Sequence, residues 1–290
     1  MPALADNVHQ LRELIRDCGL CPRACGVDRT AGQVGACRIG ERAVVVSAGA
    51  HFGEEAVLVG RGGSGTIFFA GCNLDCVFCQ NADISHSDRG RAVTAEQLAE
   101  MMLGLQRDGC ENVNVVTPTH VAHAVAEAIA IARSGGLSVP VVYNCGGYER
   151  VETLELLAGL IEIYMPDFKW ADPARGRTYS GVSDYPAVAA AALAEMYRQT
   201  GKLQTDRRGV ATRGVLVRHL VMPNDLANSR GVIDTVAQAA PGCAINIMGQ
   251  YRPCFRANEF PDLTHTPAAA DLSTLRQHAT DQALLRADHA

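Results

Sequence analysis

Apolar segments of strand length alternate with amphipathic segments of helix length through most of this 290-residue chain. Parallel neighbouring strands need crossover helices of this kind, so the alternation predicts an α/β protein with a parallel sheet. Six repeats are fewer than the eight that close a full barrel, which favours a (β/α)6 partial TIM barrel. The predicted strands span residues 66–70, 112–117, 140–144, 161–165, 214–221 and 243–248, and the predicted helices 95–107, 121–133, 151–159, 186–199 and 230–239.

The segments outside these repeats have a different character. An amphipathic helix is predicted at residues 7–16, and a stretch rich in Gly and Cys follows it to about residue 40 without either periodicity. Near the other end, the tail is expected to hold one more helix. The predicted organisation has three parts: residues 1–60 as an N-terminal helix and Cys-rich metal-binding element, 61–255 as the partial-barrel core, and 256–290 as a C-terminal tail with a helix.

Two short apolar runs, residues 43–47 and 56–59, are followed by the glycine-rich segment 60–65 and the predicted strand 66–70, an order that predicts strand structure, a turn and a strand. Gly60, Gly62 and Gly65 then match the glycine spacing of a dinucleotide-binding loop. They lead into a strand, however, so no helix N-terminus is placed to receive a pyrophosphate. We therefore interpret these glycines as a hairpin turn.

Charge and hydropathy exclude several classes of partner. The net charge is −5, with 26 Lys and Arg against 31 Asp and Glu, which gives no general attraction to nucleic acid or anionic lipid. No apolar run approaches the ~20 residues of a membrane span, and the first residues are charged where a signal peptide would be apolar. We expect a cytoplasmic protein without nucleic-acid or membrane partners.

Eleven cysteines are distributed too unevenly for a disulfide framework. Their number is odd, and a chain of this length does not need covalent cross-links to stabilise its core. Most of them form two groups, which we interpret as metal-binding thiolates: Cys18, Cys21, Cys25 and Cys37, and then Cys72, Cys76 and Cys79.

The second group, C-x3-C-x2-C, directly follows the predicted strand 66–70, where loops of α/β barrels carry ligands. Three thiolates can bind three irons of a 4Fe-4S cluster, which leaves the fourth iron open to a small molecule with an amine and a carboxylate. A zinc site is the alternative, or a redox pair formed by Cys76 and Cys79. Zinc usually takes four ligands, and a redox pair leaves Cys72 without a role.

This cysteine spacing resembles the radical S-adenosylmethionine (SAM) superfamily. The resemblance implies that the open iron binds the methionine part of SAM, and that an electron cleaves SAM to a 5′-deoxyadenosyl radical that abstracts hydrogen from the substrate. It also places Phe78 beside the adenine. Over about residues 15–255 the chain is similar to uncharacterised pyruvate formate-lyase activating enzyme-like proteins, at the segments 18–29 (CGLCPRACGVDR), 65–72 (GTIFFAGC), 78–81 (FCQN), 116–120 (VTPTH), 142–149 (VYNCGGYE), 165–169 (MPDFK) and 219–223 (HLVMP).

The same resemblance suggests further residues of the SAM pocket. Asn144 matches the family segment at the end of the third strand, and Lys169 matches an Asp-Leu-Lys segment. The activating enzymes carry Gly-Gly-Glu after the second strand, whereas this chain has Thr117-Pro-Thr-His, so Thr117 or Thr119 is expected to supply a hydrogen bond there. Gln250 is a candidate by position only. No general acid or base is assigned beyond the cluster ligands.

The N-terminal group, C-x2-C-x3-C-x11-C, lies in a segment with few apolar residues. A structural metal would offset the entropy of ordering that segment, and both zinc and a second iron–sulfur cluster accept four thiolates. Reduced thiols without a metal are the alternative.

Other reactive side chains have ordinary explanations. We interpret His120 and His123 as structural, with His120 near the substrate face. The basic residues of the 202–218 stretch are interpreted as a solvated loop, with recognition of an anionic substrate as the alternative: Lys202, Arg207, Arg208, Arg213 and Arg218. The remaining cysteines are interpreted as buried thiols, although Cys145 lies beside the predicted pocket: Cys110, Cys145, Cys243 and Cys254.

The resemblance also implies partners. A one-electron donor such as flavodoxin or ferredoxin would reduce the cluster, and a glycyl radical protein would be the substrate of an activating enzyme. Two other functions are compatible with the sequence. One is radical modification or rearrangement of a small molecule, and the other is a non-enzymatic protein that binds zinc at both cysteine groups.

Overall fold

The computed structural model of this chain describes residues 2–287. Met1, in the predicted unit 1–60, and residues 288–290, in the predicted unit 256–290, lie outside the described residues. None of the helices in the described part of the chain has the length and apolar character needed to span a bilayer.

A mostly parallel sheet forms the centre of the molecule. Each of the six predicted strands is present, and neighbours along the sheet pair in parallel: β2 (Ser64–Phe69), β4 (Asn112–Val116), β5 (Val141–Cys145), β6 (Ile163–Pro166), β8 (Ala211–Leu220) and β9 (Ala244–Met248). Antiparallel β1 (Ala43–His51) and β3 (Arg91–Val93) extend one end, β10 (Leu285–Arg286) extends the other, and β7 (Gln204–Thr205) pairs with β8. The strand order is β10-β9-β8-β6-β5-β4-β2-β1-β3, an open path among the described residues.

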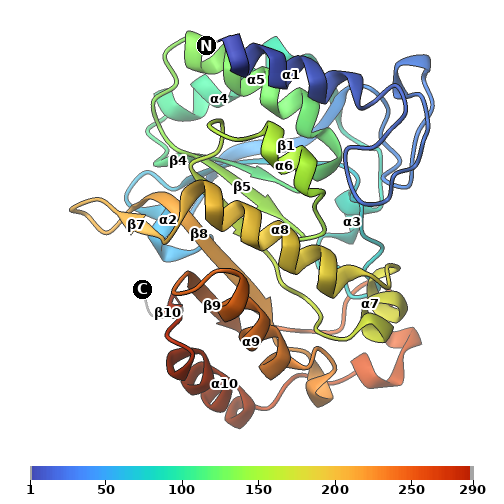
Figure 1. Cartoon of the computed structure of the whole chain (residues 1–290), viewed down its shortest axis with the longest axis vertical. Helices are drawn as coiled ribbons and strands as arrows, with labels where there is room; N and C mark the ends of the chain where they lie inside the picture. The colour runs from blue at the N-terminus through green and yellow to red at the C-terminus, as the bar shows by residue number, and fades with distance from the viewer. Residues whose placement is uncertain (1, 288–290) are drawn as a thin grey trace.

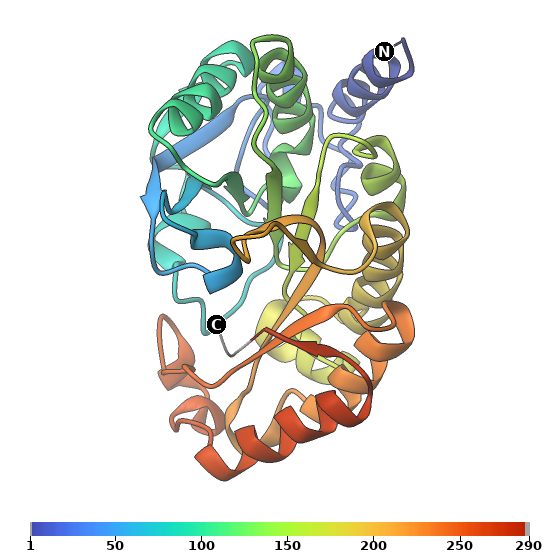
Figure 2. The ribbon, with the colours of Figure 1, turned by 90° about the vertical axis from the view of Figure 1, so that its left-hand side faces the viewer.

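Helices form the crossovers between these strands, and Figures 1 and 2 show them around the outside of the sheet. The predicted helices are all found, as α4 (Ala95–Arg107), α5 (Ala122–Ser134), α6 (Val151–Leu156), α8 (Tyr185–Thr200) and α9 (Ser229–Ala239). A capping box between Thr94 and Gln97 fixes the start of α4. The opening helix α1 (Pro2–Glu13) packs beside α5, and the tail contains α10 (Ala269–Asp281).

The prediction of a strand at residues 56–59 is wrong, because these residues form one helical turn, α2 (Ala56–Val59). Leu58 in this turn is fully buried among inward-facing residues of the parallel strands, including Val142 and Ile163. Burial against the sheet interior therefore decides the conformation of an apolar run too short to show a period. The glycines that follow complete the antiparallel connection between β1 and β2, and Gly63 has a φ of +81°.

Several short elements were not predicted. The largest is α7 (Pro173–Ser180), although Asp172 caps its start, Pro173 occupies its first turn and Gly181 ends it in the left-handed conformation. The others are the short strands β3, β7 and β10, the helix α3 (Ala82–Ser85) and five 3-10 turns: η1 (Arg29–Ala31), η2 (Thr119–Val121), η3 (Pro223–Asp225), η4 (Ala257–Glu259) and η5 (Pro261–Leu263).

Candidate functional site

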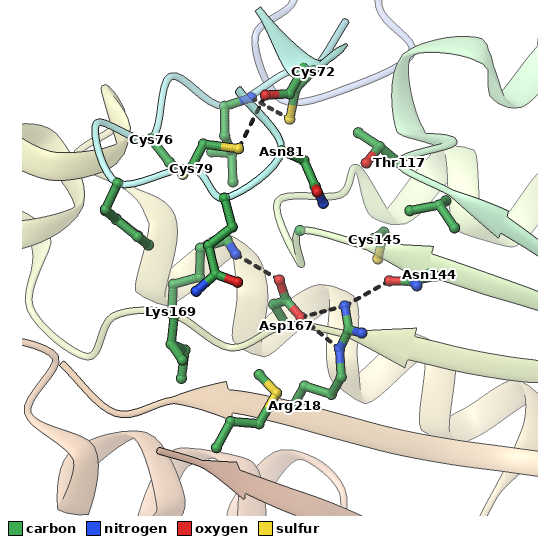
Figure 3. Close-up of a pocket in the computed structure, with 18 of the residues that line it drawn as sticks. Cys72, Cys76, Cys79, Asn81, Thr117, Asn144, Cys145, Asp167, Lys169 and Arg218 are labelled. Atoms are coloured by element: carbon green, nitrogen blue, oxygen red, sulfur yellow. Dashed lines mark hydrogen bonds and ion pairs between the residues drawn. The ribbon is translucent and has the colours of Figure 1, made fainter. Parts of the chain in front are cut away.

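A cavity of about 270 Å³ opens where the carboxyl ends of the six parallel strands meet (Figure 3). Its wall contains side chains that follow each of those strands. The predicted cluster ligands and the predicted SAM-pocket residues all line it, as do two residues of weaker standing: Cys72, Cys76, Cys79, Phe78, Thr117, Asn144 and Lys169, then Cys145 and Gln250. Residues separated by up to 178 positions in the sequence thus line the same cavity.

The three-cysteine loop is held from both sides. Gly71 starts it with a φ of +80°, and a Cβ there would lie 2.5 Å from the carbonyl oxygen of Cys37, so only glycine fits. The backbone N–H groups of Asp75 and Val77 donate to carbonyls of α7 at 3.1 and 3.0 Å. These bonds fix the loop across the mouth of the sheet.

Polar groups also approach the cysteine sulfurs. The backbone N–H of Leu74 donates to Cys72 Sγ at 3.4 Å, and Ser180 Oγ lies 3.1 Å from Cys76 Sγ. Trp170 Nε1 donates to the same Ser180 oxygen at 2.8 Å, which leaves the Ser180 hydroxyl hydrogen to point toward Cys76. Ser85 Oγ lies 3.1 Å from Cys79 Sγ. Each sulfur therefore has at least one hydrogen-bonding neighbour.

The donor set fits an iron–sulfur cluster. Burial raises the pKa of Cys72 to about 12 and that of Cys76 to about 11, so a bound cation is needed to hold them as thiolates near neutral pH. Within residues 2–287 no three His, Cys, Asp or Glu side chains are arranged around a single ion. A cluster does not require such a point, because each cysteine binds a different iron.

Aromatic rings form the wall next to the loop. Phe78 is buried, and its ring meets Trp170 edge to face with centroids 5.6 Å apart and planes at 88°. Tyr251 lies on another side, at 6.3 Å. Phe78 and Trp170 thus give the cavity an apolar, aromatic side against which a heterocycle can pack.

The opposite wall is charged. Figure 3 shows Asp167 between Lys169 and Arg218. Lys169 Nζ donates to Asp167 Oδ2 at 2.6 Å, and Arg218 Nε donates to Oδ1 at 3.0 Å. Arg218 also donates to Asn144 Oδ1 at 2.8 Å, which ties the ends of β5, β6 and β8 together.

These charges persist near neutral pH. Burial alone would raise the pKa of Asp167, but the Lys169 and Arg218 cations outweigh it and hold that pKa below its ordinary value. Burial acts to lower the pKa of Lys169, and the Asp167 carboxylate more than reverses this. Lys169 and Arg218 thus line the cavity as cations, and their N–H groups can donate charge-assisted hydrogen bonds to an anionic group.

The sequence interpretation of Arg218 as part of a solvated loop is wrong. Arg218 lies on β8 with its side chain 18% exposed, inside the cavity wall. Arg208, from the same stretch, does lie at the surface, where it pairs with Glu111 at 2.8 Å. The signal that separates them is position: Arg218 occurs within an apolar strand, where alternate side chains face the interior.

Several lining residues were not predicted at all. They include Trp170, His86, Leu220, Met222 and Met248. Glu54, beyond the lining, also belongs to the charged wall because it pairs with Arg218 at 3.4 Å. Glu54 lies 164 residues from Arg218 in the sequence, and only the fold shows that they meet.

The two threonines that follow β4 have different surroundings. Thr117 lines the cavity and has a φ of +60°, a strained conformation for a β-branched residue. Thr119 faces away from the cavity, fully buried, and donates to Glu149 at 2.6 Å. Of the two threonines, Thr117 alone is placed to contact a ligand of this cavity.

His120 and His123 do not line this cavity. Their Nε2 atoms lie 2.8 and 2.7 Å from the carbonyl oxygens of Ala70 and Glu41, and both rings are buried. The His120 bond connects the turn before α5 to the end of β2, and the His123 bond connects α5 to the segment before β1. The structural interpretation of this pair agrees with these contacts, whereas a position of His120 at the substrate face does not.

Glu149 is a buried carboxyl group whose charge is expected to affect stability. It accepts hydrogen bonds from Thr119 and, at 3.2 Å, from the Tyr143 hydroxyl. Burial raises the pKa of Glu149 to about 7, although these hydroxyl groups act to lower it. A raised pKa means that the bound proton stabilises the fold fully below pH 4.5, and that this stabilisation is lost as the pH rises toward 7.

We therefore expect Glu149→Gln to remove part of the pH dependence of stability. Glutamine keeps an acceptor for Thr119 without a buried charge, so the melting temperature of the variant relative to wild type should rise between about pH 5 and about pH 8. The shift in unfolding free energy is about 3 kcal/mol, or several degrees. The matched control is Glu152→Gln, whose side chain is 67% exposed. A difference in melting temperature that stays constant with pH would contradict the assignment.

The chain is similar in sequence to one known family and to one further protein. The sequence model of the radical SAM superfamily matches residues 66–173, which contain most of β2, the three-cysteine loop and β3 to β6. An uncharacterized protein of Methanocaldococcus jannaschii, MJ0674, is 32% identical over 271 residues, which cover 90% of this chain and 74% of that protein.

Proposed function

Because this chain belongs to the radical SAM superfamily, whose members cleave SAM reductively with a 4Fe-4S cluster, we propose that Cys72, Cys76 and Cys79 bind that cluster. The observation that carries the proposal is the convergence of three thiols on one cavity whose other walls offer aromatic, amide and cationic groups. The proposal includes a (β/α)6 partial barrel, which the open path of six parallel strands supports.

When bound, the cluster supplies one electron to the sulfonium of SAM, which yields methionine and a 5′-deoxyadenosyl radical that takes a hydrogen atom from the substrate. The protein holds the cluster with thiolates and tunes it with hydrogen bonds. Ser180, Ser85 and the Leu74 N–H are placed to donate to the three ligand sulfurs. Such bonds influence the reduction potential of iron–sulfur clusters.

The two remaining walls suit the two ends of SAM. Phe78 and the rings beside it offer an apolar face for the adenine. Lys169 and Arg218 offer positive charge to the methionine carboxylate, and Asp167 keeps both cations oriented toward the cavity. Thr117 and Asn144 add hydrogen-bonding groups between these ends. This is the arrangement that positions a small zwitterion and excludes water from it.

For the substrate we propose a glycine of a protein partner, as in an activating enzyme. A cavity of about 270 Å³ is slightly smaller than most ligand pockets, so the cluster and SAM leave little enclosed space for a third molecule. The substrate is then presented at the mouth, where Gln80 and Asn81 are exposed. A segment of a glycyl radical protein can be presented in this way. The electron donor in this proposal is a small carrier such as flavodoxin or ferredoxin.

The test of the proposed function is anaerobic reconstitution followed by reduction with dithionite in the presence of SAM. We expect a brown protein that forms 5′-deoxyadenosine and methionine in equal amounts, and none without reductant. A colourless protein that binds zinc and no iron, or an iron-loaded protein without SAM cleavage, would overturn it.

The identity of the substrate is tested by isotope transfer. Candidate glycyl radical proteins with deuterated glycine and deuterated small molecules are incubated separately with the reduced enzyme and SAM. Deuterium in 5′-deoxyadenosine from a protein partner supports the activating function. Deuterium transfer from small molecules alone would contradict the activating function and would indicate radical modification of a small molecule.

A further inference from the structure

A second, separate cavity lies between the N-terminal segment and the sheet. It is much smaller, about 10 Å³, and all four N-terminal cysteines line it: Cys18, Cys21, Cys25 and Cys37. Leu20, Arg29 and Asn73 complete much of its wall. The fold thus gathers four thiols that the sequence spreads over 20 positions, at a place distinct from the first cavity.

The segment around these thiols has little regular structure to order it. Between α1 and β1, the described helical structure is η1, a three-residue turn. The loop from Cys18 to Val27 is closed by two backbone hydrogen bonds, Cys18 N to Val27 O at 3.0 Å and Gly26 N to Cys18 O at 3.2 Å. The backbone N–H of Ala36 donates to Cys25 Sγ at 3.4 Å, and Gly35 leaves space for that sulfur. N–H groups that point at a cysteine sulfur are typical of thiolate metal sites.

Arg29 supplies an independent observation. Arg29 is 1% exposed, and its guanidinium donates to the carbonyl oxygens of Gly40 and His120, the latter at 2.7 Å. Arg29 Nη1 also lies 3.9 Å from Cys18 Sγ. In the part of the chain that the structure describes, no carboxylate forms an ion pair with this buried cation. Buried charges are normally paired with a charge of opposite sign. A centre with four thiolates on a divalent ion has a net negative charge and would be the partner of the Arg29 guanidinium.

His120 is part of the same wall. Its Nε2 faces a carbonyl oxygen and therefore carries the proton, so Nδ1 presents a lone pair. Nδ1 is buried and has no hydrogen-bond partner among the described residues. A polar atom left in this state next to four thiols is consistent with a site whose resident group binds there.

We propose that Cys18, Cys21, Cys25 and Cys37 bind a thiolate-coordinated metal centre, zinc or an iron–sulfur cluster, that orders the N-terminal segment and neutralises Arg29. The sulfurs surround the cavity without meeting at one ion position in residues 2–287, so binding requires rotation of their side chains. The centre lies against the catalytic loop, because Arg23 Nε donates to the Asn73 carbonyl at 2.8 Å. It is independent of the catalytic cluster, since different residues hold it.

The test uses the full chain with Cys72, Cys76 and Cys79 all replaced by alanine, purified anaerobically. We expect about one zinc, or about four irons with about four sulfides, per chain. Adding Cys21→Ser and Cys37→Ser to this background should remove that metal, whereas adding Cys110→Ser, at a buried thiol outside both cavities, should not. A folded triple variant with less than half of either amount would overturn the proposal, as would metal that survives Cys21→Ser and Cys37→Ser.

A second measurement does not depend on how the serine variants fold. The metal of the triple variant is removed with a strong chelator, and thiols are counted with a colorimetric disulfide reagent before and after removal. We expect about four additional reactive thiols and a lower melting temperature in the stripped protein. An unchanged thiol count would show that the metal is not bound by these cysteines. The result depends only on the thiol count and the melting temperature, and SAM cleavage is not measured.

Discussion

Replacing Cys76 by alanine is expected to lower reductive SAM cleavage by at least about 100-fold. Changes to the surroundings of metal ligands alone cost 10–100-fold in affinity or activity, and here a ligand itself is lost. Cys76 is the buried centre of the three-cysteine loop, and no other cysteine of that loop is placed to replace it. The measurements are the rate of 5′-deoxyadenosine formation and the iron bound per chain after reconstitution.

The matched control is Cys110→Ala. Cys110 is also buried, but it lies outside both cavities, so its substitution should leave the iron content and the cleavage rate near wild type. If the N-terminal centre is an iron–sulfur cluster, Cys76→Ala will retain that iron, and only the catalytic share disappears. A Cys76→Ala variant with wild-type cleavage would show that the catalytic cluster is not bound at this loop.

The sequence predicts the repeating units of the fold well, because each unit carries its own local signals. The capping box of Thr94 and Gln97 sets the start of α4, and apolar strands such as 112–117 need no distant partner to be recognised. The four residues 56–59 are different. They are too few to show a period, and their conformation follows from the burial of Leu58 against strands more than 80 residues away.

The candidate site also has one part that the sequence predicts and one part that it does not. The three-cysteine loop is predictable because its ligands are adjacent in sequence and thiolates at that spacing have few other uses. The charged wall is not, because its partners come from different strands: Arg218 pairs with Asp167, with Asn144 and with Glu54, at sequence separations of 51, 74 and 164. From the sequence alone, Arg218 is predicted to be solvated, because only the structure of β8 shows that its side chain faces the cavity.

Asp167 is the centre of that wall, and Asp167→Asn is expected to lower stability more than other single charge changes in this chain. The carboxylate offsets two buried cations, and removing one partner of a buried ion pair costs about 3–5 kcal/mol. For a chain of this size the melting temperature should fall by about 5–15 °C. Because the pKa of Asp167 is lowered in the folded chain, this stabilisation is present above pH 3.8 and is lost as the pH falls further.

The matched control is Asp206→Asn. Asp206 also pairs with an arginine, Arg208 at 2.9 Å, but the Arg208 side chain is 58% exposed, so water screens the pair and it contributes little to stability. Thermal unfolding near neutral pH should therefore separate the two variants clearly, and the gap between Asp167→Asn and wild type should narrow in acid. Equal losses for both variants would mean that Lys169 and Arg218 are not held by Asp167. The proposed orientation of these cations toward SAM would then lose its physical basis.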